Sequence, residues 1–138
     1  MRRCWPIMVL LIVVGSRVIE TQGAKPSTPV AIAEVFFAHL AKGETGKGYD
    51  ELFVGSPMTS QPTRVEALKH QTDTAVALYG KVLGVELHEE RKIGTSVVRL
   101  VYVQRLQKHP LIWTIWFYRP SANWQVNQLV FNDQLLVP

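Results

Sequence analysis

The sequence predicts an α+β fold in which three helices precede a four-stranded antiparallel sheet. Two observations favour this class. Apolar residues recur every three or four positions up to Tyr79, which is the period of a helix. Beyond Gly80, runs of β-branched and aromatic residues are separated by short turns, which is typical of strands. Turns this short join neighbouring strands in antiparallel order, and helices that precede such a sheet pack onto one of its faces.

The expected helices carry start or stop signals. Thr28 can cap the first helix and Gly43 can end it, and its inward face carries apolar residues (Val30, Ala33, Phe37, Leu40 and Ala41). The stretch GETGKG is expected to be a flexible connection, followed by one or two helical turns over residues 49–53. The third helix is expected over residues 62–79, because Gly80 closes its apolar pattern.

Four strands are expected, at residues 82–92, 95–107, 111–119 and 123–132. The third strand is apolar at nearly every position, whereas a strand that is solvated on one face alternates. The sheet face without helices is therefore expected to be covered as well. Two-fold symmetry favours a second copy of the chain as the cover.

The third strand carries two sets of side chains, because successive residues of a strand point to opposite faces. One set is Trp113, Ile115 and Phe117, and the other is Ile112, Trp116 and Tyr118. The second set is the candidate homodimer interface, although parity alone leaves open which set points outward.

Residues 1–24 have the features of a secretory signal peptide. Arg2 and Arg3 give a positive start, residues 7–14 form a short apolar run, and small residues follow. Arg17 ends the run well before the roughly 20 apolar residues that a membrane-spanning helix needs, so no stable membrane span is expected. A periplasmic or secreted location follows from this prediction.

The mature chain would consist of a linker at residues 25–29 and a domain at residues 30–138. Cys4 is the only cysteine and would leave with the signal peptide, so disulfides and thiolate ligands are not expected in the domain. The domain keeps 12 basic and 10 acidic residues, against 15 and 11 in the full chain, and no basic cluster indicates nucleic-acid binding. His88 and Glu90 share a strand face, but two ligands do not make a metal site, so neither a metal nor another cofactor is expected.

The order of three helices and four strands, with YRPSANWQVN as the last hairpin, resembles the NTF2-like superfamily, the cone fold of nuclear transport factor 2, SnoaL and ketosteroid isomerase. The stretches IGTSVVRLVYV, FYRP, WQVN and FND look like its small secreted bacterial members of unassigned function. The likeness covers residues 29–136. It implies a curved sheet that wraps the helices into a cone, a small apolar ligand inside it and a homodimer through the opposite sheet face. This architecture hosts many activities, so the resemblance implies no single one.

Enzymes that resemble this fold place a carboxylate or histidine in the cone as general base and a tyrosine or protonated acid as oxyanion donor. This chain has no acidic residue between Glu90 and Asp133, so its late strands offer no such carboxylate. The groups left for a dyad are acids and tyrosines elsewhere (Asp50, Asp73, Glu86, Tyr79 and Tyr102). We therefore expect a non-catalytic protein. The alternatives are a SnoaL-type isomerase or cyclase of an apolar ketone and a protein-interaction subunit of an envelope assembly.

Arg99 is the main polar candidate for ligand binding. It lies within VVRLVYV on a strand that should be central, and a buried guanidinium needs an acceptor. That acceptor is either a ligand carboxylate or an acid of the chain such as Asp133. Tyr102, Trp113 and Asn127 complete the candidate ligand-binding residues. The tryptophans are favoured as core and interface anchors over a stacking platform for a ligand.

Overall fold

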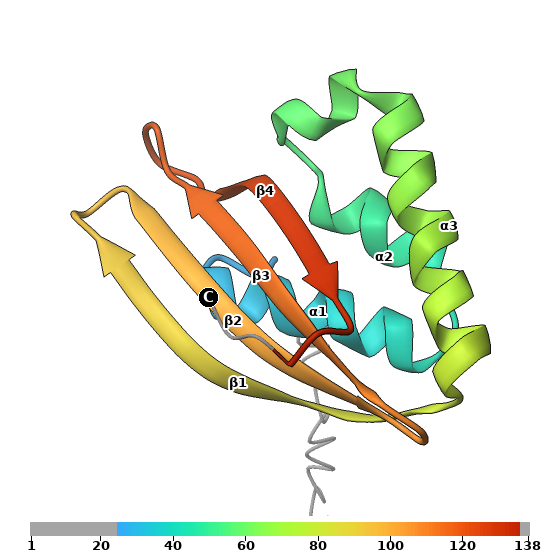
Figure 1. Ribbon diagram of the computed structural model, residues 1–138. Coiled ribbons are helices and arrows are strands. Elements are labelled where there is room, and N and C mark those ends of the chain that lie inside the picture. The colour runs from blue at the N-terminus through green and yellow to red at the C-terminus, as the bar shows by residue number, and fades with distance from the viewer. Residues whose placement is uncertain (1–24, 136–138) are drawn as a thin grey trace, which may run out of the picture.

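The computed structural model describes residues 25–135, so the signal peptide expected at residues 1–24 lies outside the described part. In this part, three α-helices precede an antiparallel sheet with the strand order β1-β2-β3-β4, which confirms the expected fold class. The sheet is open and curved (Figure 1). The elements are α1 (Pro29–Ala41), α2 (Thr45–Leu52), the 3-10 helix η1 (Pro57–Ser60), α3 (Pro62–Tyr79), β1 (Val82–Ile93), β2 (Val97–Leu106), β3 (Pro110–Tyr118) and β4 (Gln125–Asn132).

The first and third helices lie where the sequence places them. The Thr28 hydroxyl accepts a hydrogen bond from the Ala31 N–H at 3.2 Å, and Gly43 follows α1 in the left-handed conformation, with a φ of 75°. α3 ends at Tyr79, and Gly80 follows it with a φ of 89°. Both glycines thus adopt a backbone conformation that other residues rarely take.

The second helix begins at Thr45, so the expectation that GETGKG is a flexible connection is wrong. The buried residues of α2 recur at helical spacing along one face (Thr45, Gly48, Tyr49 and Leu52). A Cβ atom at Gly48 would lie 3.1 Å from the Cβ atom of His39, so glycine allows the close approach of α2 to α1. Burial therefore outweighs the low helix propensity of the glycines.

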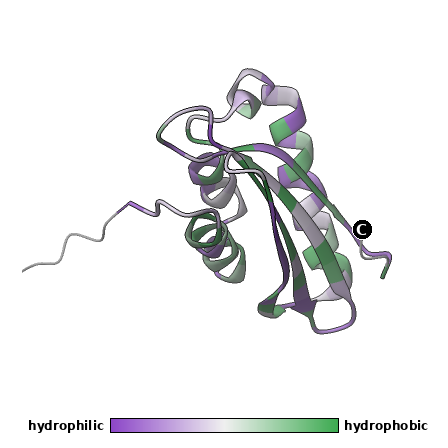
Figure 2. Cartoon of the chain, turned by 90° about the vertical axis from the view of Figure 1, so that its left-hand side faces the viewer, coloured by the Kyte–Doolittle hydropathy of each residue, from purple (hydrophilic) through white to green (hydrophobic). Residues whose placement is uncertain are grey.

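Helices α1 and α2 lie on one face of the sheet (Figure 2), and α3 lies beside its edge strand β4 (Figure 1). The β3 side chains on the helix-covered face are at most 1% exposed (Leu111, Trp113, Ile115 and Phe117). Successive side chains of a strand point to opposite faces, so the face without helices carries Ile112, Trp116 and Tyr118.

Aromatic side chains fill the space between α1 and the sheet. The ring of Trp113 lies 5.5 Å from Phe36 and 5.6 Å from Phe37, both on α1. Phe131 of β4 stacks on the same indole at 4.4 Å. The indole N–H donates a hydrogen bond to Oε1 of Gln104 on β2 at 2.9 Å. Trp113 therefore joins α1, β2, β3 and β4 in one cluster.

Replacing Trp113 by Ala is expected to lower the free energy of unfolding by about 3–5 kcal/mol, because it removes a fully buried indole and leaves a cavity. Trp116→Ala is the matched control, since Trp116 lies on the same strand but is only half-buried, on the other face. Its loss is expected to cost clearly less. Urea denaturation followed by circular dichroism measures both variants, and equal losses would contradict the assignment of the two faces.

Candidate functional site

A groove of about 520 Å³ lies between α3 and the neighbouring ends of β3 and β4. Its apolar wall consists of Ala75 and Leu78 from α3, Leu111 from β3 and Phe131 from β4. Polar side chains complete the lining (His70, Gln71, Thr74, Tyr79, Asn132 and Asp133). The groove therefore combines an apolar surface with a few polar groups, as small-molecule sites do.

The groove exists because α3 is held by α2 more than by the sheet. Thr72 is the single buried residue of α3, and its hydroxyl donates to the Leu68 carbonyl while accepting from the Tyr49 hydroxyl at 2.8 Å. The Thr45 hydroxyl donates to Asp73 at 2.6 Å, which adds a second bond between α2 and α3. The apolar side chains of α3 that face the sheet stay only partly buried, so the helix leaves open space beside β4.

Tyr79 and Asp133 form the polar end of the groove. The Tyr79 hydroxyl donates a hydrogen bond to the Asp133 carboxylate, which raises the pKa of Tyr79 and lowers the pKa of Asp133. The ring of His109 lies 4.9 Å from that of Tyr79, and its Nε2 lies 2.6 Å from the backbone oxygen of Asp133. At neutral pH this end of the groove therefore presents a phenol and a carboxylate.

The acids considered for a catalytic dyad have other partners. Asp50 accepts from Lys69 at 3.0 Å, and Asp73 accepts from Thr45. Glu86 lies 3.4 Å from Arg105 at the edge of the sheet. Within residues 25–135, none of these three carboxylates makes a hydrogen bond to Tyr79 or Tyr102, and Tyr79 pairs instead with Asp133.

Tyr102 and Trp113 lie in the core under α1. The Tyr102 ring is 2% exposed and lies 4.7 Å from the ring of Phe37. Its burial, followed by the charges of Glu34 and Glu90, raises the pKa of Tyr102 to about 12. In the described part of the chain, the Tyr102 hydroxyl has no hydrogen-bond partner.

Arg99 and Asn127 lie elsewhere. Arg99 is on the helix-free face of β2, where its guanidinium donates to Glu89 at 2.8 Å and lies 5.6 Å from the Trp116 ring. The expected pairing with an acid of the chain is confirmed, but that acid is Glu89 and not Asp133. Asn127 is exposed on β4 and accepts from Gln125 at 3.0 Å. The four candidate ligand-binding residues thus do not converge on one pocket.

The candidate interface residues share the helix-free face but differ in exposure. Ile112 is 3% exposed, Trp116 is half-buried beneath Arg99, and Tyr118 is 37% exposed. The three residues therefore do not form a continuous exposed surface, since Ile112 is already covered and Arg99 lies over Trp116.

Among residues 25–135, none of the helices has both the length and the apolar composition needed to cross a membrane. Over the same residues, no three or more His, Cys, Asp and Glu side chains are grouped so that they could hold a metal ion.

Comparison of the chain with protein-family models, with the curated proteins and with the solved structures finds no match. The structure itself shows a small α+β fold with three helices and a curved four-stranded antiparallel sheet, compatible with a cone. A function must therefore be argued from the groove and the sheet face of this chain.

Proposed function

We propose that this chain is an exported, non-catalytic domain of the NTF2-like class that binds a small apolar molecule and associates with a second copy through its sheet. The groove between α3 and β4 carries the proposal. Its volume of about 520 Å³ falls in the range of roughly 300–1,000 Å³ that small-molecule sites occupy. The features of residues 1–24 support export, and the three helices on a curved sheet support the class.

The chemistry of the groove favours a ligand with an apolar body and a hydrogen-bond donor at one end. Leu78 and Phe131 offer apolar contact area, and the buried Leu111 lies at the base of the groove. Asp133 is a carboxylate that accepts hydrogen bonds and repels anions, and it already holds the Tyr79 hydroxyl in place. An apolar alcohol or amine matches this arrangement better than a carboxylic acid does.

The interior of the cone is a less favourable site for the ligand. The indole of Trp113 is 0% exposed and contacts aromatic rings from α1 and β4. A ligand at this place would have to displace side chains from a packed core, which costs far more than entering an existing groove. We therefore place the ligand beside the sheet rather than between α1 and the sheet.

The helix-free sheet face supports association with a second copy. Val97 of β2 pairs with Tyr118 of β3 on one side and with Ile93 of β1 on the other, and both Tyr118 and Ile93 are exposed. The exposed Val130 of β4 and the half-buried Trp116, which Arg99 partly covers, lie on the same face. Charged residues of both signs border it on β1 (Glu86, Glu89 and Arg91). An apolar centre with a polar rim of mixed charge is typical of protein interfaces and suits a two-fold dimer.

Filling the groove is expected to abolish ligand binding. Ala75→Trp places an indole against the groove wall, whereas Ala77→Trp adds the same group at an exposed position of α3 outside the groove. Native mass spectrometry with a mixture of uncharged aromatic and aliphatic alcohols should show a bound adduct for the wild type and Ala77→Trp, and at least a roughly tenfold weaker adduct for Ala75→Trp. Equal binding by the two variants would place the ligand elsewhere.

A charge at the centre of the sheet face is expected to prevent self-association. Trp116→Glu should give a folded monomer, because the carboxylate would be desolvated at the interface while the core stays intact. Sedimentation velocity and circular dichroism test this against wild type and against Ala77→Glu, a control on α3. A wild-type chain that is monomeric at micromolar concentration, or a Trp116→Glu chain that still dimerises, would contradict the proposed interface.

A further inference from the structure

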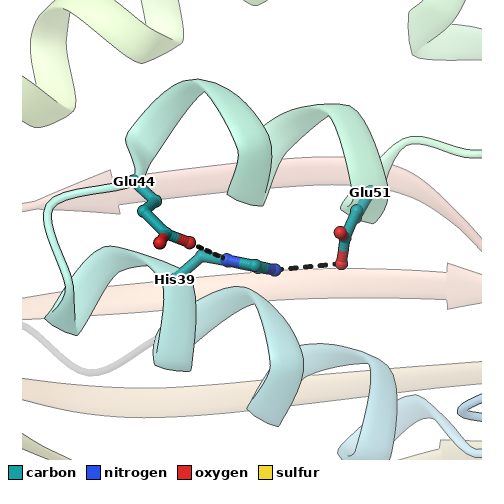
Figure 3. Close-up of polar contacts among 3 residues, drawn as sticks. All are labelled: His39, Glu44 and Glu51. Atoms are coloured by element: carbon teal, nitrogen blue, oxygen red, sulfur yellow. Dashed lines mark hydrogen bonds and ion pairs between the residues drawn. The ribbon is translucent and has the colours of Figure 1, made fainter.

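His39 lies between two carboxylates where α1 and α2 meet. Its Nδ1 lies 2.6 Å from Oε2 of Glu44, and its Nε2 lies 3.0 Å from Oε2 of Glu51. Figure 3 shows the imidazole of α1 reaching one carboxylate at the start of α2 and the other near its end. The His39 side chain is 12% exposed, so the protein covers most of it.

The geometry requires a proton on each ring nitrogen. A neutral imidazole has one N–H and one lone pair, so it can donate to only one of the two carboxylates and would repel the other. An imidazolium donates to both, and such charge-assisted hydrogen bonds are stronger than neutral ones. The two carboxylates are therefore satisfied together only when His39 carries a positive charge.

The groups around His39 also favour its protonated form. The hydrogen bonds that His39 donates to Glu44 and then to Glu51 raise the pKa of His39 against the opposing effect of its burial. The hydrogen bond from His39 lowers the pKa of Glu44, and Lys47 of α2 and Lys42 of the α1–α2 connection lower it further. The cluster is thus a cation between two anions, with two lysines beside the first anion.

We propose that protonated His39 is a pH-sensitive cross-link between α1 and α2, and that loss of its proton frees one of the two carboxylates and loosens α2. The close contact of Gly48 with His39 places the cross-link at a point where the two helices approach each other closely. α2 in turn holds α3 through Thr45 and Tyr49, so loosening α2 reaches the helix that forms one wall of the groove. The cross-link itself does not depend on whether the groove binds a ligand.

The sign of the pH effect follows from the two pKa directions. Because the pKa of His39 is raised in the folded chain, its contribution to stability is fully present below about pH 6.5, the ordinary value, and is lost as the pH rises through the folded value. Because the pKa of Glu44 is lowered, its contribution is present above about pH 4.5 and is lost as the pH falls through the folded value. The cross-link is therefore complete in mildly acidic solution.

NMR of the folded wild-type chain from pH 5 to 9 tests the proposal. The His39 ring nitrogens should both be protonated at pH 6, and the ring should titrate above pH 6.5. As the pH rises through the range in which His39 loses its proton, hydrogen exchange of the amides from Gly48 to Phe53 should accelerate more than intrinsic base catalysis alone predicts. A pKa of His39 that is one pH unit above its ordinary value corresponds to about tenfold extra acceleration. Amides at the centre of β2 and β3 should stay far better protected than those of α2 over the whole pH range, because α2 opens without unfolding of the sheet.

Three variants of the cluster and one control variant separate the cross-link from general effects of substitution. Glu51→Gln and Glu44→Gln should each lower the titration of His39, because a neutral amide stabilises the imidazolium less than a carboxylate does. His39→Gln should remove the extra pH dependence of exchange in α2, while His88→Gln, on the exposed part of β1, should leave it unchanged. A His39 that titrates at or below pH 6.5, or α2 exchange with the same pH dependence in wild type and His39→Gln, would overturn the proposal.

Discussion

The structure depends on the burial of one indole. Trp113 packs against two phenylalanines of α1 and stacks on Phe131 of β4, while Gln104 of β2 accepts the hydrogen bond of its N–H. An indole N–H without an acceptor would be costly in this core, so the hydrogen bond to the buried Gln104 adds to the stabilisation by the apolar contacts. This cluster fixes α1 on the sheet and fills the space in which a cone-shaped fold would otherwise hold a ligand.

Each of the other two helices is held in place by the helix before it: α1 holds α2, and α2 holds α3. α2 packs closely on α1 through Gly48 and the His39 cluster, and α3 is tied to α2 through Tyr49, Thr72 and the Thr45–Asp73 hydrogen bond. α3 contributes no large side chain to the fully buried core. The groove beside β4 is therefore a consequence of how α3 is held, and its shape follows the position of α2.

Local patterns predicted the elements, but not the contacts that depend on distant parts of the chain. The bounds of α3 and the parity of β3 follow from short-range periodicity. The start of α2 does not, because its glycines disfavour a helix and only packing against α1 makes one form. The partner of Arg99 was missed because an irregularity in β1 between Leu87 and Glu89 turns these two residues to opposite faces, whereas a regular strand would keep them on one.

The groove, too, is formed by residues that are far apart in the chain, and local patterns do not predict it. Tyr79 and Asp133 are 54 residues apart and meet only because the end of α3 lies beside the end of β4. Neither the spacing of the two residues nor the composition around them signals this pairing. The sequence makes Tyr102 and Trp113 candidate ligand-binding residues, yet whether such residues line a cavity or fill a core depends on the helices that pack against them.

The central claim is that apolar molecules bind in the groove between α3 and β4 and not in the core. The most direct test is a titration of the folded chain with 1-naphthol, an apolar probe with a hydroxyl donor, followed through the methyl NMR signals of its leucines and valines. The account predicts saturable shifts for Leu78 and Leu111, which line the groove, and unchanged signals for Val98 and Leu100 in the core. Shifts centred on Val98 and Leu100, or no saturable shift at Leu78 and Leu111, would contradict it.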